Sequence, residues 1–486
     1  MTRLQKKLFL CGCLTALGCC FVTSAVAAEK GNLPITTTSA EALKLYQEGK
    51  SELKYNTEAA RKSWRKATEL DPNFALAHVQ LAFLAQNTTE QFAEIQKAIA
   101  SRTHASPAEQ LVVDWLDNAL KGKMIPAIQA LNDVLEMYPE DMDFNSEGAF
   151  WLQYRGACDR AIPIYESILK RDRSFANAWQ GLGDCYIKSG SVSKGLAAMK
   201  QYVAQAPNQA SSEIRYGETL AKAGQYDRAI AHCKTGLDKD STAIQGWHCL
   251  AQAHALKGEG LRAREEYKRF LDAPGVNPMQ HEAVALEWAA TYVQEGDYKA
   301  ADESFTAVAT EAHKAALGQF EAEAYRSMAL YHEDNSALEL LAKADSSLQE
   351  HPISGLNRAG ERAKLLQTRV MLALRLQDMS MAEAAVKQLG ELAAAASMPA
   401  AERCHSGATG SLQVAQGKFA DAIPYLQEDS DNAFSLQDLV VAYRKTGANK
   451  LSRATQDKLA KNPSLSLEQI LVNKDSHKQK IQIASK

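Results

Sequence analysis

The fold is decided by residues 176–207, which read ANAWQGLGDCYIKSGSVSKGLAAMKQYVAQAP. Trp179, Leu182 and Tyr186 recur at i, i+3 and i+7, which is the spacing of one face of an α-helix. Gly190 then ends this helix, because glycine adopts a positive φ at little steric cost. A second helical run extends to Pro207, which cannot continue a helix. The stretch therefore predicts two helices joined by a tight turn.

The glycine that ends the first helix recurs through the middle of the chain at a constant interval of residues. Five glycines keep this stride, and a small residue follows each of them five positions later: Gly122, Gly156, Gly190, Gly224 and Gly258, then Ala127, Ala161, Gly195, Ala229 and Ala263. A fixed period of this size indicates a repeated supersecondary unit, and stacked units bury apolar faces that one helix pair cannot bury alone. We expect the small residues where two helices cross closely.

The unit at 176–207 resembles the tetratricopeptide repeat (TPR). The residues that carry the resemblance are Trp179, Leu182, Gly183, Tyr186, Gly195, Met199 and Pro207. The resemblance implies an all-α fold, an α-solenoid of stacked antiparallel helix pairs that forms a TPR superhelix. It also implies a concave surface lined by first helices, which in TPR proteins binds peptides or extended segments of partners.

The strength of the pattern divides the chain into six segments. We predict a signal peptide at 1–28, a polar lead-in at 29–39, N-terminal TPR-like repeats at 40–105, a regular TPR array at 106–275, a divergent TPR-like array at 276–430, and C-terminal capping helices with a polar tail at 431–486. Residues 272–278 (DAPGVNP) are either a long loop or a boundary between two sub-arrays. Residues 466–469 match a capping box, which predicts a short helix at 467–473 that closes the exposed end of the stack.

The first 28 residues have the three parts of a signal peptide. Arg3, Lys6 and Lys7 form the basic start, residues 8–22 are apolar, and residues 25–28 offer a small-residue cleavage site. The apolar run is short for a membrane span. We therefore expect an exported protein, periplasmic or extracellular, without a membrane span.

A lipoprotein leader is the alternative, because Leu17-Gly18-Cys19 resembles a lipobox. Cys19 would then carry a lipid anchor and hold the protein on an envelope membrane.

Composition and charge are those of ordinary soluble material, with 46% hydrophobic residues, 23% charged residues and a formal net charge of −3. This charge provides no basic face for nucleic acid. The five cysteines beyond the leader match no metal or haem spacing: Cys158, Cys185, Cys233, Cys249 and Cys404. We interpret them as small buried hydrophobes. The alternative is a disulfide between Cys233 and Cys249, which export would permit.

Motifs for catalysis are missing from the sequence, which contains no HExxH, no Walker loop and no GxSxG. We predict no enzyme activity, no cofactor and no metal site. For the polar cluster Tyr331-His332-Glu333-Asp334, a solvated turn is favoured over a metal site. The remaining alternative is an enzyme with its site in the divergent region 310–395.

Seven polar residues stand at positions of the first helices that are expected to face the concave surface: Gln180, Asp184, Arg215, Glu218, Lys222, His248 and Gln252. We interpret them as a groove, in which Arg215 is suited to pair with an acidic group of a ligand. The competing interpretation is a solvated face without a hot spot. We infer an exported TPR scaffold that binds protein or peptide partners along its concave face, without catalysis. The alternative is a lipid-anchored component of an envelope assembly complex.

Overall fold

The computed structural model describes residues 31–53, 57–332 and 335–474, and within these ranges every regular element is a helix. The elements are α1 (Ala40–Glu52), α2 (Thr57–Leu70), α3 (Ala75–Phe83), α4 (Thr88–Ala100), the short 3-10 helix η1 (Arg102–His104), α5 (Pro107–Leu120), α6 (Met124–Met137), α7 (Met142–Tyr154), α8 (Cys158–Arg171), α9 (Ala176–Lys188), α10 (Val192–Gln205), α11 (Ala210–Lys222), α12 (Tyr226–Lys239), α13 (Gln245–Leu256), α14 (Gly260–Leu271), α15 (Pro278–Glu295), α16 (Tyr298–Lys314), α17 (Gly318–Tyr331), α18 (Asn335–Glu350), α19 (Gly355–Arg375), α20 (Met379–Ala396), α21 (Pro399–Ala415), α22 (Phe419–Glu428), α23 (Ala433–Lys445) and α24 (Asn449–Lys461). A further helical segment at 467–474 follows α24.

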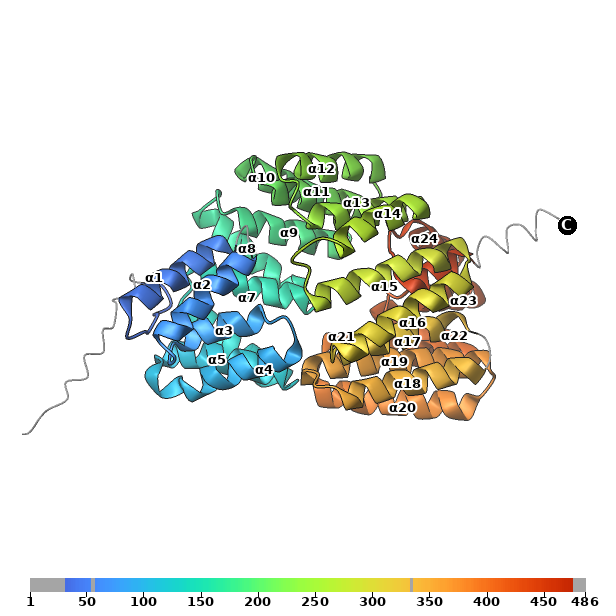
Figure 1. Cartoon of the computed structure of the whole chain (residues 1–486). Coiled ribbons are helices and arrows are strands. Elements are labelled where there is room, and N and C mark those ends of the chain that lie inside the picture. Colours follow the sequence, from blue (N-terminus) through green and yellow to red (C-terminus); the bar gives the residue numbers. More distant parts are fainter. Residues whose placement is uncertain (1–30, 54–56, 333–334, 475–486) are drawn as a thin grey trace, which may run out of the picture.

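The helices form antiparallel pairs that stack on their neighbours. α11, for example, packs on its partner α12 and also on α9 and α13, so first helices lie beside first helices along one surface. Figure 1 shows the pairs following a curved path, from α1 in blue through α10–α14 in green to α15–α20 in yellow and orange. The predicted α-solenoid of stacked antiparallel helix pairs is confirmed.

Glycine makes the tight turn within each regular pair. The five glycines that keep the stride all have a positive φ, between 74° and 84°. After Gly190, the N–H of Ser191 donates to the carbonyl of Tyr186 at 2.8 Å, which closes the end of α9. The same left-handed turn recurs at Gly417 and Gly447, outside the regular array.

The two helices of a pair cross where side chains are smallest. A Cβ at Gly195 of α10 would lie 3.0 Å from the carbonyl oxygen of Gly183 in α9, so the two backbones are nearly in contact. Ala161, Ala229 and Ala263 occupy the equivalent positions and have no exposed surface. The small residues therefore lie at close helix crossings, as the spacing predicts.

Gly296, the next glycine that ends a first helix, follows Gly258 after a longer spacing than in the regular array, for two structural reasons. The loop between α14 and α15 covers residues 272–277, and α15 has 18 residues where α13 has 12. Asn277 caps α15 with a complete capping box, and α14 still packs on α15. The stack therefore continues across this loop, which favours the long-loop interpretation of 272–278.

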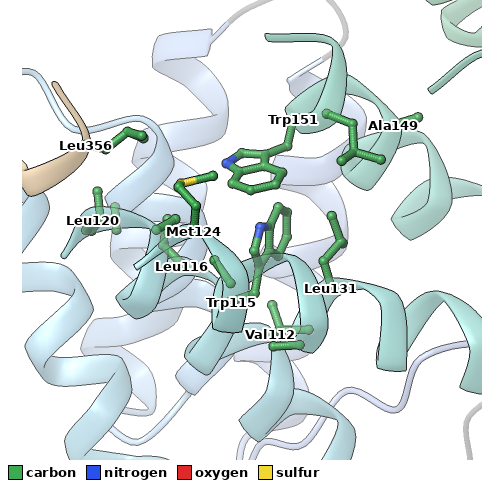
Figure 2. Close-up of a cluster of buried hydrophobic side chains, with 14 of the residues drawn as sticks. Val112, Trp115, Leu116, Leu120, Met124, Leu131, Ala149, Trp151 and Leu356 are labelled. Atoms are coloured by element: carbon green, nitrogen blue, oxygen red, sulfur yellow. The ribbon is translucent and has the colours of Figure 1, made fainter. Parts of the chain in front are cut away.

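The superhelix curves far enough for distant pairs to meet. α19 packs against α5, and a Cβ at Gly122 would lie 3.1 Å from the backbone carbon of Gly355. Leu356 belongs to the same buried cluster as Leu120 and Met124, and Figure 2 shows Leu356 beside them. Helices α19–α21 thus share a core with helices α5–α8, which lie far earlier in the chain.

The predicted short helix at 467–473 is confirmed, since residues 467–474 are helical, but the predicted capping box at its start does not form. Ser466 caps the segment by accepting the N–H of Gln469, but the side chain of Gln469 donates to the carbonyl of Leu459 and does not close a capping box. Leu467 and Ile470 pack into a cluster with residues of α15, α16 and α17. The segment therefore folds back onto α15, α16 and α17, which come much earlier in the chain.

Cys233 of α12 and Cys249 of α13 form a disulfide, with Cα atoms 5.8 Å apart. The bond joins the second helix of one pair to the first helix of the next. Gly217 of α11 leaves room for it, because a Cβ there would lie 2.7 Å from the sulfur of Cys233. Our interpretation of these two residues as simple buried thiols is wrong, and the alternative holds. Cys158 and Cys185 are buried free thiols.

Two predictions for the N-terminus, the signal peptide at 1–28 and the lipid anchor at Cys19, lie outside the described residues. Among the helices that are described, none has the length and apolar character needed to cross a membrane.

We expect Ala161→Leu to destabilise the fold by about 1–3 kcal/mol, because the larger side chain has no space at a close helix crossing. Urea unfolding followed by circular dichroism measures this. Lys170→Leu on the exposed face of the same helix is the control, and should change stability by about 0.5 kcal/mol or less. Equal midpoints for the two variants would contradict the assigned register.

Reduction of the Cys233–Cys249 bond should lower the stability of the oxidised protein by about 3 kcal/mol, because the bond closes a loop with a sequence separation of 16. The test compares urea midpoints with and without reductant. The double variant Cys233→Ala/Cys249→Ala is the control, and reductant should leave its midpoint unchanged. An equal effect of reductant on both proteins would rule out the bond as the cause.

Candidate functional site

The concave side of the C-terminal half holds a cavity of about 1000 Å³. Most of its walls come from α15, α17, α19, α21 and α23, which are the first helices of successive pairs, and from residues 465–468 of the folded-back segment. Phe305 of α16 and residues Asp429, Asp431 and Asn432 between α22 and α23 complete the lining. In Figure 1 these helices lie in the right half of the picture, with α17 and α19 below the yellow α15 and α23 at the right. The stack of first helices therefore forms a hollow, as expected for a concave binding surface.

The predicted groove residues lie upstream of this cavity, on three adjacent first helices. Gln180 and Asp184 are on α9, one turn apart, and both are half-buried. Burial raises the pKa of Asp184, and the charges of Lys222 and Arg215 on α11 oppose this rise. Asp184, Arg215 and Lys222 therefore form one local charged cluster.

α11 contributes an ion pair to the same surface. Arg215 donates to Glu218 at 2.9 Å. Burial opposes ionisation of Glu218, but the positive charges of Arg215 and Lys222 outweigh it and lower its pKa. The predicted groove at α11 is charged and internally paired, so Arg215 already has a carboxylate partner before any ligand binds.

α13 connects the predicted groove to the cavity. His248 and Gln252 both contact the carboxylate of Glu287 on α15, at 2.9 Å and 3.2 Å. Tyr267 donates to the same carboxylate at 3.0 Å. Burial lowers the pKa of His248, but the negative charge of Glu287 outweighs it and the pKa is raised overall. Since Glu287 lines the cavity, the predicted polar surface continues into it.

A second charged cluster lies deeper in the cavity, and sequence reasoning missed it. Arg326 of α17 is buried and donates to Glu323 at 2.6 Å and to Glu468 of the folded-back segment at 2.8 Å. Burial opposes ionisation of Glu323, but the charges of Arg326 and Lys364 lower its pKa to about 2. The cluster joins two segments of the concave side that are far apart in sequence.

The repeat register contains the signal that would have located this cluster. Glu323 and Arg326 stand five and eight residues after the start of α17, as Arg215 and Glu218 stand after the start of α11. Applying the same offsets to the divergent helix therefore places both residues on the concave face.

Carboxylates outnumber cations around the cavity. The lining includes seven acids, Glu287, Glu323, Glu361, Asp429, Asp431, Asp438 and Glu468, and four bases, Arg326, Lys364, Arg375 and Arg403. Burial, together with the nearby charge of Glu323, raises the pKa of Glu361 even though Lys364 donates to it at 3.0 Å. Burial also raises the pKa of Asp438. Because the acids outnumber the bases and burial disfavours the charged forms of Glu361 and Asp438, a cationic group in the cavity would be stabilised.

Apolar side chains make up much of the remaining lining: Leu286, Phe305, Phe320, Leu330, Met371, Leu374, Phe434 and Leu465. A concave site that combines apolar walls with polar and charged groups has the general character of a ligand site.

Helices α16–α20 occupy the region 310–395, and the described residues there contain no strand. In the polar cluster at 331–334, His332 contacts Asp302 at 3.0 Å and the hydroxyl of Ser336 at 3.0 Å. Residues 333 and 334 lie outside the described part of the chain. The structure therefore pairs His332 with Asp302, a residue outside the predicted cluster.

One segment of the chain matches a known protein family. The tetratricopeptide repeat family matches residues 154–216, which run from the end of α7 into α11. No curated protein matches this sequence at a significant level.

Several solved structures are similar to parts of this chain. They include a thermophilic TPR protein from Thermus thermophilus (16% identity, TM-score 0.33, covering 38% of this chain and 99% of that chain). A TPR protein from Parabacteroides merdae shares 13% identity (TM-score 0.34, 49% and 98% covered). PilW, a type IV pilus biogenesis factor, shares 20% identity (TM-score 0.33, 44% and 96% covered). Each alignment spans nearly all of the solved chain and less than half of this one.

The buried carboxyl group of Asp429 gives the cavity a testable pH dependence. It accepts hydrogen bonds from Ser435 at 2.6 Å and Gln367 at 2.7 Å, but burial outweighs them and raises its pKa to about 6. A raised pKa means that the folded state disfavours the charged form. Wild-type stability should therefore fall as pH rises from about 4 to 6.

Asp429→Asn removes this charge and keeps an acceptor for both donors. We expect the variant to match the wild type near pH 4 and to exceed its unfolding free energy by about 3 kcal/mol above pH 6. Urea unfolding across this pH range measures the difference. The exposed Asp457→Asn on α24, away from the cavity, is the control, with an expected effect of about 0.5 kcal/mol or less. A stability difference for Asp429→Asn that does not change with pH would contradict the assignment.

Proposed function

We propose that this chain is an exported scaffold, without catalysis, that binds protein or peptide partners along its concave face. The observation that carries the proposal is the continuity of that face. The polar surface at Asp184, Arg215 and Glu218 passes through His248 and Glu287 into the cavity of about 1000 Å³. A surface that extends over many first helices suits an extended segment, whose contacts are shared among successive repeats.

The lining also indicates the chemistry of the partner. The apolar walls can accommodate apolar side chains of an extended segment. The excess of carboxylates in the lining favours a basic residue between those apolar side chains. A cation next to Glu361 would favour the charged form of this carboxylate, whose pKa burial raises. We therefore propose a peptide segment in which apolar residues flank a lysine or arginine.

Fluorescence anisotropy with two peptides of equal length tests this. One peptide combines Gly, Leu and Arg, and the other combines Gly, Leu and Glu. We expect the basic peptide to bind at least about tenfold more tightly at low salt, a difference of about 1.4 kcal/mol, and to lose affinity as salt is raised. Equal affinity of the two peptides would overturn the proposed partner chemistry.

Glu361→Gln should remove part of the preference for the basic peptide, since it deletes one carboxylate of the cavity. Glu391→Gln, exposed on the second helix α20, is the matched control and should bind both peptides as the wild type does. The same loss in both variants would place the binding outside the cavity.

Export is proposed from the leader alone, and cell fractionation tests it. We expect the mature protein in the soluble envelope fraction, beginning near residue 29. Partition into the detergent phase, with a lipid-modified Cys19 at its N-terminus, would support the lipid-anchored envelope component instead. An intact Met1 in the cytoplasmic fraction would overturn both.

A further inference from the structure

The ends of three consecutive helices meet away from the concave cavity and bring two histidines and a glutamate together. His313 lies in the last turn of α16, Glu321 in the first turn of α17, and His351 directly after α18. His351 is distant in sequence from the other two residues, so no local sequence motif predicts the cluster. The cluster is independent of the proposed peptide site, since none of the three lines the cavity.

The three side chains converge on one point. His313 Nδ1 lies 3.2 Å from an Oε2 atom of Glu321, and His351 Nε2 lies 3.2 Å from the same oxygen. The two ring nitrogens are themselves 3.2 Å apart. The three atoms therefore form a nearly equilateral triangle.

This triangle has the size of one face of a zinc coordination tetrahedron. Zinc binds histidine nitrogen and carboxylate oxygen at about 2.0–2.2 Å in tetrahedral geometry. The edge of such a tetrahedron is about 3.3–3.5 Å, which follows from those bond lengths. The observed separations of 3.2 Å are close to this edge, so an ion just above the triangle would contact all three atoms with little movement of the side chains.

A fourth ligand is within reach on the solvent side. Glu350 precedes His351, and one of its carboxylate oxygens lies within 4.8 Å of a ring nitrogen of each histidine. The side chain of His313 is 55% exposed, so the site is open to ions and to water. Two histidines, one carboxylate and an open fourth position are a known ligand set for zinc.

The backbone around the cluster is rigidly placed. The side chain of Glu321 is only 8% exposed, so its carboxylate is fixed. Gly318 lets the start of α17 lie directly against the end of α18: a Cβ there would be 2.5 Å from the carbonyl oxygen of Ser347 and 3.0 Å from Cβ of His351. Ser354 caps α19 and holds the other end of the short loop that carries His351.

Hydrogen bonds alone account poorly for this arrangement. If each histidine donates to Glu321, two N–H groups point at one oxygen while their nitrogens stand 3.2 Å apart. A cation at the centre would instead use the lone pairs of all three atoms at once, with both imidazoles neutral.

We propose that His313, Glu321 and His351 form a binding site for one divalent transition metal ion of the zinc type, with Glu350 or water as the fourth ligand. The ion would join the ends of α16, α17 and α18 in the region where the repeat pattern is weakest. It would act as a structural clamp between these helices. The assignment goes against our sequence-based prediction of no metal site.

Cobalt titration of the full chain tests the site. The protein carries no histidine tag and is first treated with chelator. We expect Co²⁺ to produce one equivalent of the intense visible absorption of tetrahedral coordination, and Zn²⁺ to abolish it by displacement. Absence of saturable absorption, together with no Zn²⁺ binding by calorimetry, would overturn the proposal.

Variants locate the site. His313→Ala and His351→Ala should each weaken Co²⁺ binding at least tenfold, and Glu321→Gln should weaken it while keeping the size of the side chain. His332→Ala is the control, because His332 lies nearby in sequence but contacts Asp302 instead of the cluster. Wild-type affinity in both His313→Ala and His351→Ala would refute the assignment.

A stability readout covers the case in which a variant folds poorly. Zn²⁺ should raise the melting temperature of the wild type and of His332→Ala, and leave that of His313→Ala unchanged. His313 is more than half exposed, so its replacement should leave the metal-free fold intact. An equal Zn²⁺-induced shift in His313→Ala and the wild type would place the bound metal elsewhere and overturn the proposal.

Discussion

The close crossing of two helices within each pair is the contact on which the rest of the structure depends. At Gly183 and Gly195 the backbones of α9 and α10 approach so closely that a single Cβ would nearly touch the opposite carbonyl. Alanines without exposed surface hold the equivalent place in other pairs. Since a close crossing fixes the distance between helix axes, each pair presents its outer faces to the next pair in the same way. Stacking, curvature and the concave surface follow from this repetition.

Curvature then creates the hollow interior. The stack turns until α19 reaches α5, and the chain end folds back until Glu468 reaches Arg326. The protein's own segment at 465–468 forms one wall of the cavity. Buried carboxylates such as Asp429 and Glu361 are retained within it although burial raises their pKa values. Such groups cost stability, and this cost is typical of sites that serve binding.

The sequence predicted the fold because its evidence is local and repeated. A glycine with positive φ and a small residue five positions later recur at a stride that needs no knowledge of distant contacts. The same register placed Arg215 and Glu218 on first helix α11, and their role as binding residues stays a prediction. The cavity was not predicted, because Glu323 and Arg326 belong to helices whose landmarks have diverged. Three further contacts join segments far apart in the sequence, so the repeat period could not predict them. They are the contacts of Leu356 with α5, of Glu468 with Arg326, and of His313 with His351.

If the repeats stack regularly, equivalent positions in successive repeats lie at equal distances from one another. Lys200, Lys234 and Lys268 are exposed on successive second helices and stand at equivalent positions of their repeats. Spin labels attached through non-natural amino acids at these positions allow all three distances to be measured by electron paramagnetic resonance. We expect the distance between positions 200 and 234 to equal the distance between positions 234 and 268. The distance between positions 200 and 268 should be close to the sum of these two. Clearly unequal steps, or a 200–268 separation no longer than a single step, would contradict it.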